Sequence, residues 1–194
     1  LKLSVKELKK LDANDGKKVQ NFKRSLIGLN TKLKSHYKIK FHMLEEINIL
    51  FWLYPALVMP LEIREDSQIV KDSINNKNAK IYKMLSTLKE IANGHEAKWY
   101  VRGFVLSMTE SAEDIEGGYK LIQKVFRNYV IPIVPLFETA KALENGTSIL
   151  KEFFAMDKAI LKSHKTKWSG RFEVMLGYSD SSKESGVLPS RYLI

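Results

Sequence analysis

The sequence contains no cysteine, which excludes disulfide bonds and thiolate metal sites and favours a reducing compartment such as the cytoplasm. Long apolar runs are also missing. The longest, from Ile47 to Pro55, is interrupted by Asn48 and falls short of the ~20 residues that a membrane-spanning helix needs. The N-terminus has neither a secretory apolar segment nor an initiator methionine. We therefore expect a globular cytoplasmic protein with no membrane partner, and a chain that is a fragment of a longer one.

Positive charge, in contrast, is abundant, with a formal net charge of +10. Residues 1–50 hold 12 Lys or Arg against 5 Asp or Glu, a local balance of +7. A basic stretch of this kind attracts nucleic acid, acidic lipid or anionic substrates. The solvated face of a helix is the interpretation we favour, because basic and aromatic residues are not interleaved as a base-stacking surface requires. We expect residues 1–54 to form a basic helical region, and we expect no nucleic-acid partner.

Hydrophobic spacing predicts two helices in this basic region. Apolar residues of the first recur at intervals of three and four, at Val19, Phe22, Leu26, Leu29, Leu33 and Tyr37. Residues 41–53 are apolar on more than one side, which is typical of a helix wedged between neighbours.

Beyond Pro55 the pattern changes to strands that are followed by helices. Apolar runs that end in polar residues occur at 56–67, 99–109, 130–139 and 172–186, with centres near residues 60, 103, 134 and 175. Their spacing is that of βα units, and their continuous apolar character suits a parallel sheet buried on both faces. We predict an α/β fold in which residues 55–194 form a partial TIM-like (β/α) barrel with four strand-helix units. An open doubly wound sheet is the alternative, but none of the runs is followed by a Gly-rich phosphate loop.

Helical sequence follows the first three runs. The first helix is expected over about Ser67–Asn93 and the third over about Thr147–Lys162. The second is expected to start at Ser111, because Asp114 three residues later completes a capping pair.

Polar residues stand where the predicted strands end. Parallel strands finish on one side of a sheet, so Arg64, Ser107, Glu138 and Asp180 should converge on one rim. Simpler interpretations remain open at this point: Glu138 could cap a helix, Arg64 could pair with Glu65 or Asp66, and the last run could end in an ordinary Gly/Ser turn.

Four of these segments resemble the motifs of one enzyme family. Pro135-Leu136-Phe137-Glu138-Thr139 and Met175-Leu176-Gly177-Tyr178-Ser179-Asp180-Ser181-Ser182-Lys183 resemble the paired central motifs of phosphoenolpyruvate carboxylase. Leu61-Glu62-Ile63-Arg64-Glu65-Asp66-Ser67 is similar to the upstream motif that supplies a substrate arginine, and Val105-Leu106-Ser107-Met108 to another barrel strand. The four motifs follow the family's order over residues 57–187, as a central part of a short or divergent member would show.

The resemblance implies a (β/α) barrel enzyme, a carbon–carbon lyase that joins bicarbonate to phosphoenolpyruvate through carboxyphosphate and a metal-stabilised enolate, giving oxaloacetate and phosphate. It implies that Glu138 and Asp180 bind Mg²⁺ or Mn²⁺. It further implies that Arg64 contacts phosphate or carboxyphosphate, that Lys183 helps to hold the anionic substrates, and that the enzyme is a homotetramer. Hard carboxylate oxygens suit either metal ion, and Arg and Lys suit phosphate.

The same resemblance assigns Leu136 and Met175 to a small apolar pocket around the methylene of the enolate. Two positions depart from the family pattern, since Glu65 replaces the usual Gln and Glu184 the usual Asp. The family's upstream histidine motif, its mobile Gly/Arg-rich loop and its C-terminal arginines have no counterpart in these residues. We therefore expect the isolated chain to be inactive. The alternative function is a non-catalytic helical and half-barrel module that binds a protein or nucleic acid through its basic N-terminal helices.

Overall fold

The computed structural model describes residues 16–92, 97–156, 158–168, 170–186, 188, 191 and 192, apart from the side chains of Ser179, Asp180, Glu184 and Ser185. The chain divides into two compact units. Residues 1–61 and 87–100 form one, called here the helical unit, and residues 62–86 and 101–194 form the other, the sheet unit. Every helix among the described residues is too short or too polar to span a bilayer.

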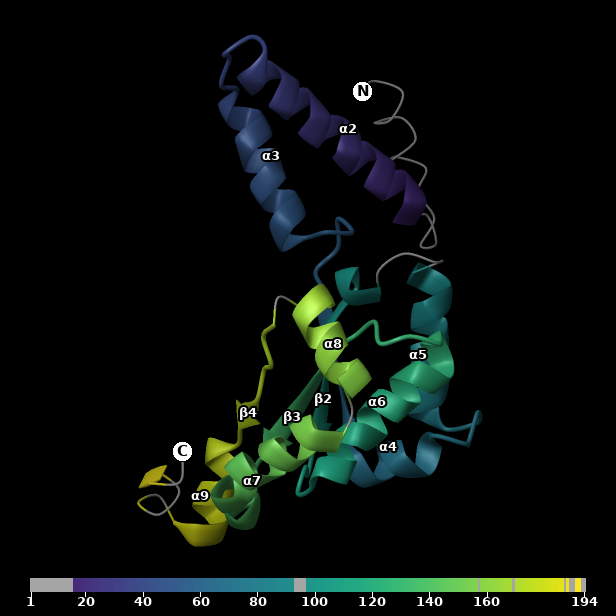
Figure 1. Cartoon of the computed structure of the whole chain (residues 1–194), viewed down its shortest axis with the longest axis vertical. Helices are drawn as coiled ribbons and strands as arrows, with labels where there is room; N and C mark the ends of the chain where they lie inside the picture. Colours follow the sequence, from purple (N-terminus) through teal and green to yellow (C-terminus); the bar gives the residue numbers. More distant parts are fainter. Residues whose placement is uncertain are drawn as a thin grey trace. The chain divides into compact units, whose positions relative to one another are not determined.

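The helical unit contains a hairpin of α2 (Gly16–Ser35) and α3 (His42–Leu53), drawn in purple and blue in Figure 1. Leu26, Leu44 and Phe51 form its buried core, and Phe22, Leu33 and Ile47 pack against them. The predicted helix is confirmed up to Ser35, but Tyr37 lies beyond its end and is exposed. The expectation for the second helix was wrong in one respect. Leu44 and Phe51 are its buried residues, whereas much of its remaining apolar surface is open to solvent.

The sheet unit is built on four strands in the order β1-β2-β3-β4. They are β1 (Leu61–Asp66), β2 (Val101–Ser107), β3 (Ile133–Phe137) and β4 (Met175–Leu176), and β3 runs parallel to both β2 and β4. In the first pairing Val105 is opposite Val134, and in the second Leu136 is opposite Met175. The predicted α/β class with a parallel sheet is therefore confirmed.

Further helices lie along the chain, and residues 87–100, which include the end of the second one and the 3₁₀ turn below, belong to the helical unit. The helices are α4 (Ser67–Ser73), α5 (Lys80–Ala92), α6 (Ala112–Phe126), α7 (Ala140–Met156), α8 (Lys158–Lys167) and α9 (Tyr178–Ser185), with a short 3₁₀ turn at Ala97–Trp99. Helix α6 packs on β2 and β3 (Figure 1), and an added Cβ at Gly118 would lie 2.8 Å from Leu106 Cδ1. The predicted start of α6 is confirmed, because Ser111 and Asp114 form a complete capping box.

Three boundaries differ from the prediction. Residues 56–60 lie before β1 in a turn, where Leu57 has a φ of +61°, although their apolar character suggested a strand. The single helix expected over 67–93 is divided into α4 and α5 by an Asn-rich turn, in which Asn76 Oδ1 accepts from Asn78 N. The helix expected over 147–162 is likewise two helices, α7 and α8.

The core of the sheet unit contains a hydrogen-bonded pair of ionisable side chains. The Tyr119 hydroxyl lies 2.6 Å from His164 Nε2 and accepts from the Ile133 N–H at 3.2 Å, and His164 Nδ1 lies 3.0 Å from the Arg171 carbonyl. Because Nδ1 faces a carbonyl, it carries the proton, and Nε2 accepts from Tyr119. Burial lowers the pKa of His164, only partly offset by its bond to Arg171, and burial raises the pKa of Tyr119. The pair is therefore neutral inside the fold.

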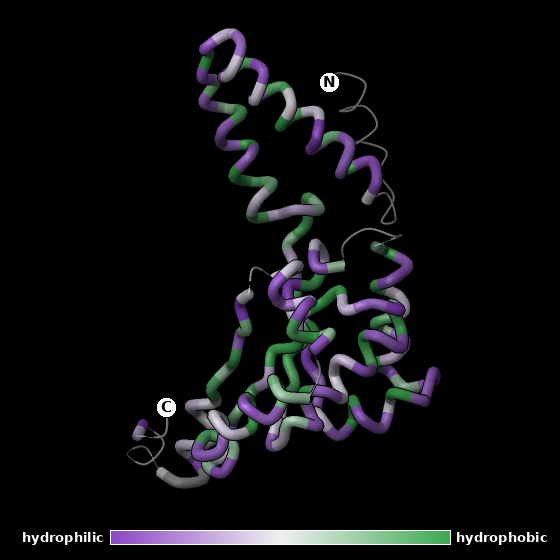
Figure 2. The backbone as a smooth tube through the Cα atoms, in the orientation of Figure 1, coloured by the Kyte–Doolittle hydropathy of each residue, from purple (hydrophilic) through white to green (hydrophobic). Residues whose placement is uncertain are grey.

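The distribution of hydrophobic residues differs between the sheet unit and helix α2 of the helical unit. In Figure 2 the sheet unit has a predominantly hydrophobic centre, whereas hydrophilic and hydrophobic residues alternate along α2. That alternation reflects a helix whose polar face carries six Lys or Arg and no acidic residue between Gly16 and Ser35.

Candidate active site

Arg64, in the second half of β1, and Glu138, directly after β3, are 74 positions apart in the sequence and meet in the structure. Arg64 Nη2 lies 3.6 Å from Glu138 Oε2, with 57% of the Arg64 side chain and 9% of the Glu138 side chain exposed. The alternative partners of Arg64 are engaged elsewhere. Glu65 Oε1 accepts from the Asp66 N–H, and Asp66 caps α4 by accepting from the backbone of Gln68 and Ile69. The structure therefore joins the ends of β1 and β3 through an ion pair.

The turn after β2 fixes the other oxygen of Glu138. The Met108 N–H donates to Glu138 Oε1 at 2.8 Å, and Met108 has a left-handed φ of +53°. For a residue other than glycine this conformation costs about 1–2 kcal/mol, so the surrounding contacts must enforce it. One such contact is the Ser67 hydroxyl, which donates to the Met108 carbonyl at 2.9 Å. Ser107, predicted at this rim, precedes this turn directly and is partly buried.

Glu138 does not serve as the cap of the helix that follows it. The Thr139 hydroxyl has that function, since it accepts from the Ala142 N–H at 3.1 Å. Glu138 itself is buried and its carboxylate points to Met108 and Arg64. The carboxylate is thus held at the strand end with Oε2 on the side of a cationic group.

Gly177 brings the end of β4 against Glu138. Its N–H donates to the Phe137 carbonyl at 2.7 Å, and a Cβ at position 177 would overlap Glu138 Cβ and lie 2.8 Å from Glu138 Cα. A side chain at this position would collide with backbone, so the close approach requires glycine. Asp180 follows in the first turn of α9, but its side chain lies outside the described residues.

The two apolar residues predicted to line the pocket lie side by side. Leu136 and Met175 are register partners in β3 and β4, and Met175 packs against a buried cluster of Leu136, Val105 and Val134. This cluster is on the same face of β3 as Glu138, because residues 134, 136 and 138 alternate with 135 and 137 along the strand.

Lys183 lies on α9, about one turn beyond Asp180, and is exposed. The structure thus brings Arg64 to Glu138 and Met175 to Leu136, two residues before Glu138. Gly177, which precedes α9, lies against Glu138. The roles assigned to all these residues stay predictions. Among the side chains that the structure describes, no group of three or more His, Asp or Glu forms a metal site.

A second buried carboxylate, that of Asp114, joins two helices and does not belong to the candidate site. Asp114 accepts from Lys71 Nζ at 2.7 Å and from the backbone of Glu110 and Ser111, which ties α4 to the start of α6. Burial by itself raises the pKa of Asp114, but the hydrogen bonds from Lys71 and Glu110 outweigh it and leave that pKa below its ordinary value. Asp114 is therefore an ionised anchor between two helices.

The sequence model of the phosphoenolpyruvate carboxylases matches residues 31–194. The chain belongs to the phosphoenolpyruvate carboxylase family. It is 30% identical over 117 residues to the phosphoenolpyruvate carboxylase of Psychromonas ingrahamii, an alignment that covers 60% of this chain and 12% of that protein. It is 38% identical over 98 residues to that of Methylorubrum extorquens, covering 46% of this chain and 10% of that protein. The chain thus spans about a tenth of the length of these carboxylases.

The family match contains Arg64, Glu138 and Gly177, together with the Met108 turn. Sequence reasoning did not find the contributions of Ser67 and Met108, which act through a hydroxyl and a backbone N–H. It quoted Gly177 within a family motif and at the end of an apolar run, but assigned it no contact. Neither the left-handed turn nor the close approach leaves a pattern in the chain, because both depend on where neighbouring strands lie.

Proposed function

We propose that this chain provides the central strand ends of a phosphoenolpyruvate carboxylase site, where bicarbonate and phosphoenolpyruvate give oxaloacetate and phosphate through carboxyphosphate. The observation that supports this most directly is the Arg64–Glu138 pair, at 3.6 Å, within a chain of this family. The remaining strands of a (β/α) barrel and the other catalytic groups are assigned to polypeptide outside these residues, since the chain covers about a tenth of its relatives. The isolated chain is accordingly expected not to turn over.

Glu138 and Asp180 are the residues that would hold Mg²⁺ or Mn²⁺, for which carboxylate oxygens are suitable ligands. Glu138 fits this role, because Oε1 accepts the Met108 N–H and Oε2, which faces the Arg64 guanidinium, is the oxygen that a metal ion would take. Asp180 belongs to a helix whose start at Gly177 is pressed against Glu138. When bound, the divalent ion supplies Lewis-acid stabilisation of the developing enolate oxygen.

The cationic side chains would hold the anionic reactants. Arg64 is more than half exposed at the strand end, and its planar guanidinium can bind two oxygens of phosphate or carboxyphosphate. Lys183 offers a compact charge from α9. Holding both reactants at neighbouring strand ends lowers the entropic cost of their reaction.

Leu136 and Met175 would form the apolar wall beside the methylene of the enolate. Their pairing across β3 and β4 presents adjoining apolar surface on the face that leads to Glu138. Such a wall excludes water, which would otherwise protonate the enolate or hydrolyse carboxyphosphate. Kinship with the family also supports a cytoplasmic homotetramer for the complete enzyme.

Binding of Mn²⁺ to the full 194-residue chain tests the proposal, with Glu138→Ala as the variant and Glu152→Ala, an exposed glutamate on α7, as the matched control. Electron paramagnetic resonance of free Mn²⁺ should show weak binding that falls by about tenfold or more in Glu138→Ala and is unchanged in the control. A coupled malate dehydrogenase assay should detect no oxaloacetate from the isolated chain.

Equal Mn²⁺ binding by Glu138→Ala and the unmodified chain would contradict the metal assignment. Salt-sensitive binding of nucleic acid with no response to metal would instead support the alternative, a binding module that uses its basic helices. Robust bicarbonate-dependent formation of oxaloacetate would show that the chain is sufficient for catalysis.

A further inference from the structure

Helix α3 carries two columns of large apolar side chains, and α2 covers only one of them. The covered column includes Leu44 and Phe51, which are 8% and 2% exposed. The second column includes Met43 and Leu50, seven residues apart on the same face, which are 60% and 52% exposed. Helical residues at this spacing lie almost directly above one another. The hairpin therefore has a filled seam and, next to it, an unfilled one.

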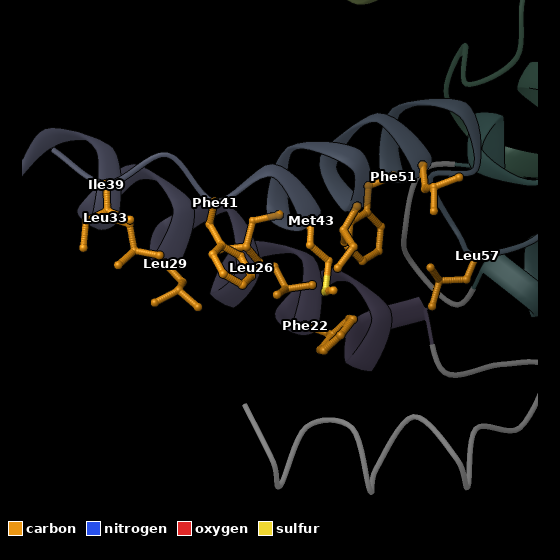
Figure 3. Close-up of a pocket in the computed structure, with 12 residues that line it drawn as sticks. Phe22, Leu26, Leu29, Leu33, Ile39, Phe41, Met43, Phe51 and Leu57 are labelled. Carbon is orange, nitrogen blue, oxygen red and sulfur yellow. The ribbon is translucent and has the colours of Figure 1, made fainter. Parts of the chain in front are cut away.

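The unfilled seam is one wall of an apolar groove along the hairpin, shown with its side chains in Figure 3. The groove has a volume of about 860 Å³, and all twelve residues that line it, from Phe22 to Leu57, are apolar. Its α2 wall consists of Phe22, Leu26, Leu29 and Leu33. These positions are spaced by four, three and four and extend over roughly 16 Å at ~1.5 Å per residue.

The shape and chemistry of the groove fit an α-helix better than a small ligand. Apolar positions at intervals of three and four on both walls are those into which the side chains of a third helix pack. A site for a small metabolite usually offers a few polar groups that fix the ligand's orientation, and this lining has none. An amphipathic helix needs no such groups, because it lays one apolar face into the groove.

Positive charge around the groove favours an amphipathic helix with acidic residues beside its apolar face. Residues 16–61 hold 8 Lys or Arg and 2 Glu, a balance of +6, and the glutamates already have partners, since Glu45 pairs with Lys34 and Glu46 contacts the His42 ring. Exposed Lys32 precedes Leu33, and exposed Lys38 and Lys40 flank Ile39 of the lining. Two copies of this hairpin would repel each other, whereas acidic residues beside an apolar stripe would be attracted.

We infer that the α2–α3 groove is a docking site for an amphipathic helix of another polypeptide segment, with an apolar stripe at intervals of three and four and acidic residues along its flanks. The length of the relatives supports a polypeptide occupant, because the chain covers only 12% and 10% of two of them, which have ample further chain to supply a helix. This docking site lies within the helical unit and is independent of the chemistry proposed for the strand ends.

Two designed peptides test the docking site on the full 194-residue chain. Both carry leucines at helical spacings of three and four on one face, and the flanking positions are glutamate in one and lysine in the other. Fluorescence anisotropy at low salt should show saturable binding of the glutamate peptide at least about tenfold tighter than that of the lysine peptide, with the difference shrinking as salt is added.

Neighbouring residues of α3 provide a matched pair of variants. Leu50 lines the groove, whereas Ile49 does not line it and is similarly exposed, at 58% against 52%. Leu50→Glu should weaken binding of the glutamate peptide by about tenfold or more, since it places a charge in an apolar groove, and Ile49→Glu by less than about threefold. Because both side chains are exposed, both variants should keep the helical content of the unmodified chain by circular dichroism.

Four results would overturn the inference. They are no saturable binding of the glutamate peptide, equal binding of the two peptides, equal effects of the two substitutions, and a concentration-dependent dimer in sedimentation that Leu50→Glu abolishes. The dimer would assign the groove to a second copy of the chain. Binding to phosphatidylserine vesicles that Leu50→Glu abolishes, without peptide binding, would assign it to a lipid surface.

Discussion

Replacing Glu138 by Gln should strengthen the binding of inorganic phosphate to the metal-free chain. In the structure Glu138 Oε2 lies 3.6 Å from Arg64 Nη2, so the carboxylate neutralises part of the charge that phosphate would meet. Glutamine keeps the shape of the side chain and can still accept the Met108 N–H through its carbonyl oxygen. The substitution therefore removes the negative charge and leaves the strand ends in place.

The separation of the two groups sets the size of the effect. At 3.6 Å, Coulomb attraction is about 1.2 kcal/mol in bulk water and about 4.6 kcal/mol at an effective dielectric constant of ~20. Because 57% of the Arg64 side chain is exposed, solvent screening brings the value towards the lower figure, about 1 kcal/mol. A change of that size corresponds to roughly a fivefold gain in phosphate affinity, at ~1.4 kcal/mol per factor of ten.

Phosphate titrations followed by ³¹P line broadening would measure the gain, with Glu152→Gln as the matched control on α7. Adding Mn²⁺ should raise phosphate affinity in the unmodified chain, because the ion would take the Glu138 oxygen that now faces Arg64. It should not do so in Glu138→Gln, which has no carboxylate at this position to bind the ion. If Glu138→Gln bound phosphate no better than the control, Arg64 would not be the group that the carboxylate restrains. If Arg64→Gln bound phosphate as tightly as the unmodified chain, the role of Arg64 itself would be wrong.

Gly177→Ala should destabilise the sheet unit by about 1–3 kcal/mol in urea unfolding, because the added Cβ overlaps Glu138, whereas Gly28→Ala, with nothing within 4 Å of the added Cβ, should stabilise α2 by about 0.5–1 kcal/mol. A loss below about 0.5 kcal/mol for Gly177→Ala would contradict the close approach. Folding lowers the pKa of His164, so the unfolded chain binds more protons than the folded chain between the two pKa values. The free energy of unfolding should therefore rise with pH from the lowered pKa up to about 6.5, by at most ~1.4 kcal/mol per pH unit, and then level off. A matching rise in His164→Gln would assign the pH dependence to other groups.

Much of the fold could be predicted from local patterns. The interval of three and four in α2, the capping pair at Ser111 and Asp114, and the apolar runs of β2 and β3 all lie within single segments. Such patterns reflect the geometry of one helix or strand, so they can be recognised without neighbours. The family motifs likewise lie within short segments, and the family match over residues 31–194 confirms the resemblance.

Two of the errors concern apolar residues that no neighbouring element buries. Residues 56–60 are apolar enough for a strand but form a turn, and Met43 and Leu50 of α3 are large apolar residues, like Leu44 and Phe51, which α2 covers. Hydrophobicity indicates that a side chain favours burial, but it does not indicate whether a neighbour is there to bury it. The groove along the hairpin is a consequence that periodicity alone could not reveal.

The order of strands and helices, and the placing of an arginine and a glutamate where strands end, were determined by the sequence alone. Only the tertiary structure decided that Arg64 faces Glu138, that a backbone N–H of Met108 holds the other oxygen, and that Gly177 lies against the Cα and Cβ of Glu138. The physical reason is that these contacts join residues 30 to 74 positions apart, and each depends on which strands pair and in which register, a property that no single segment carries.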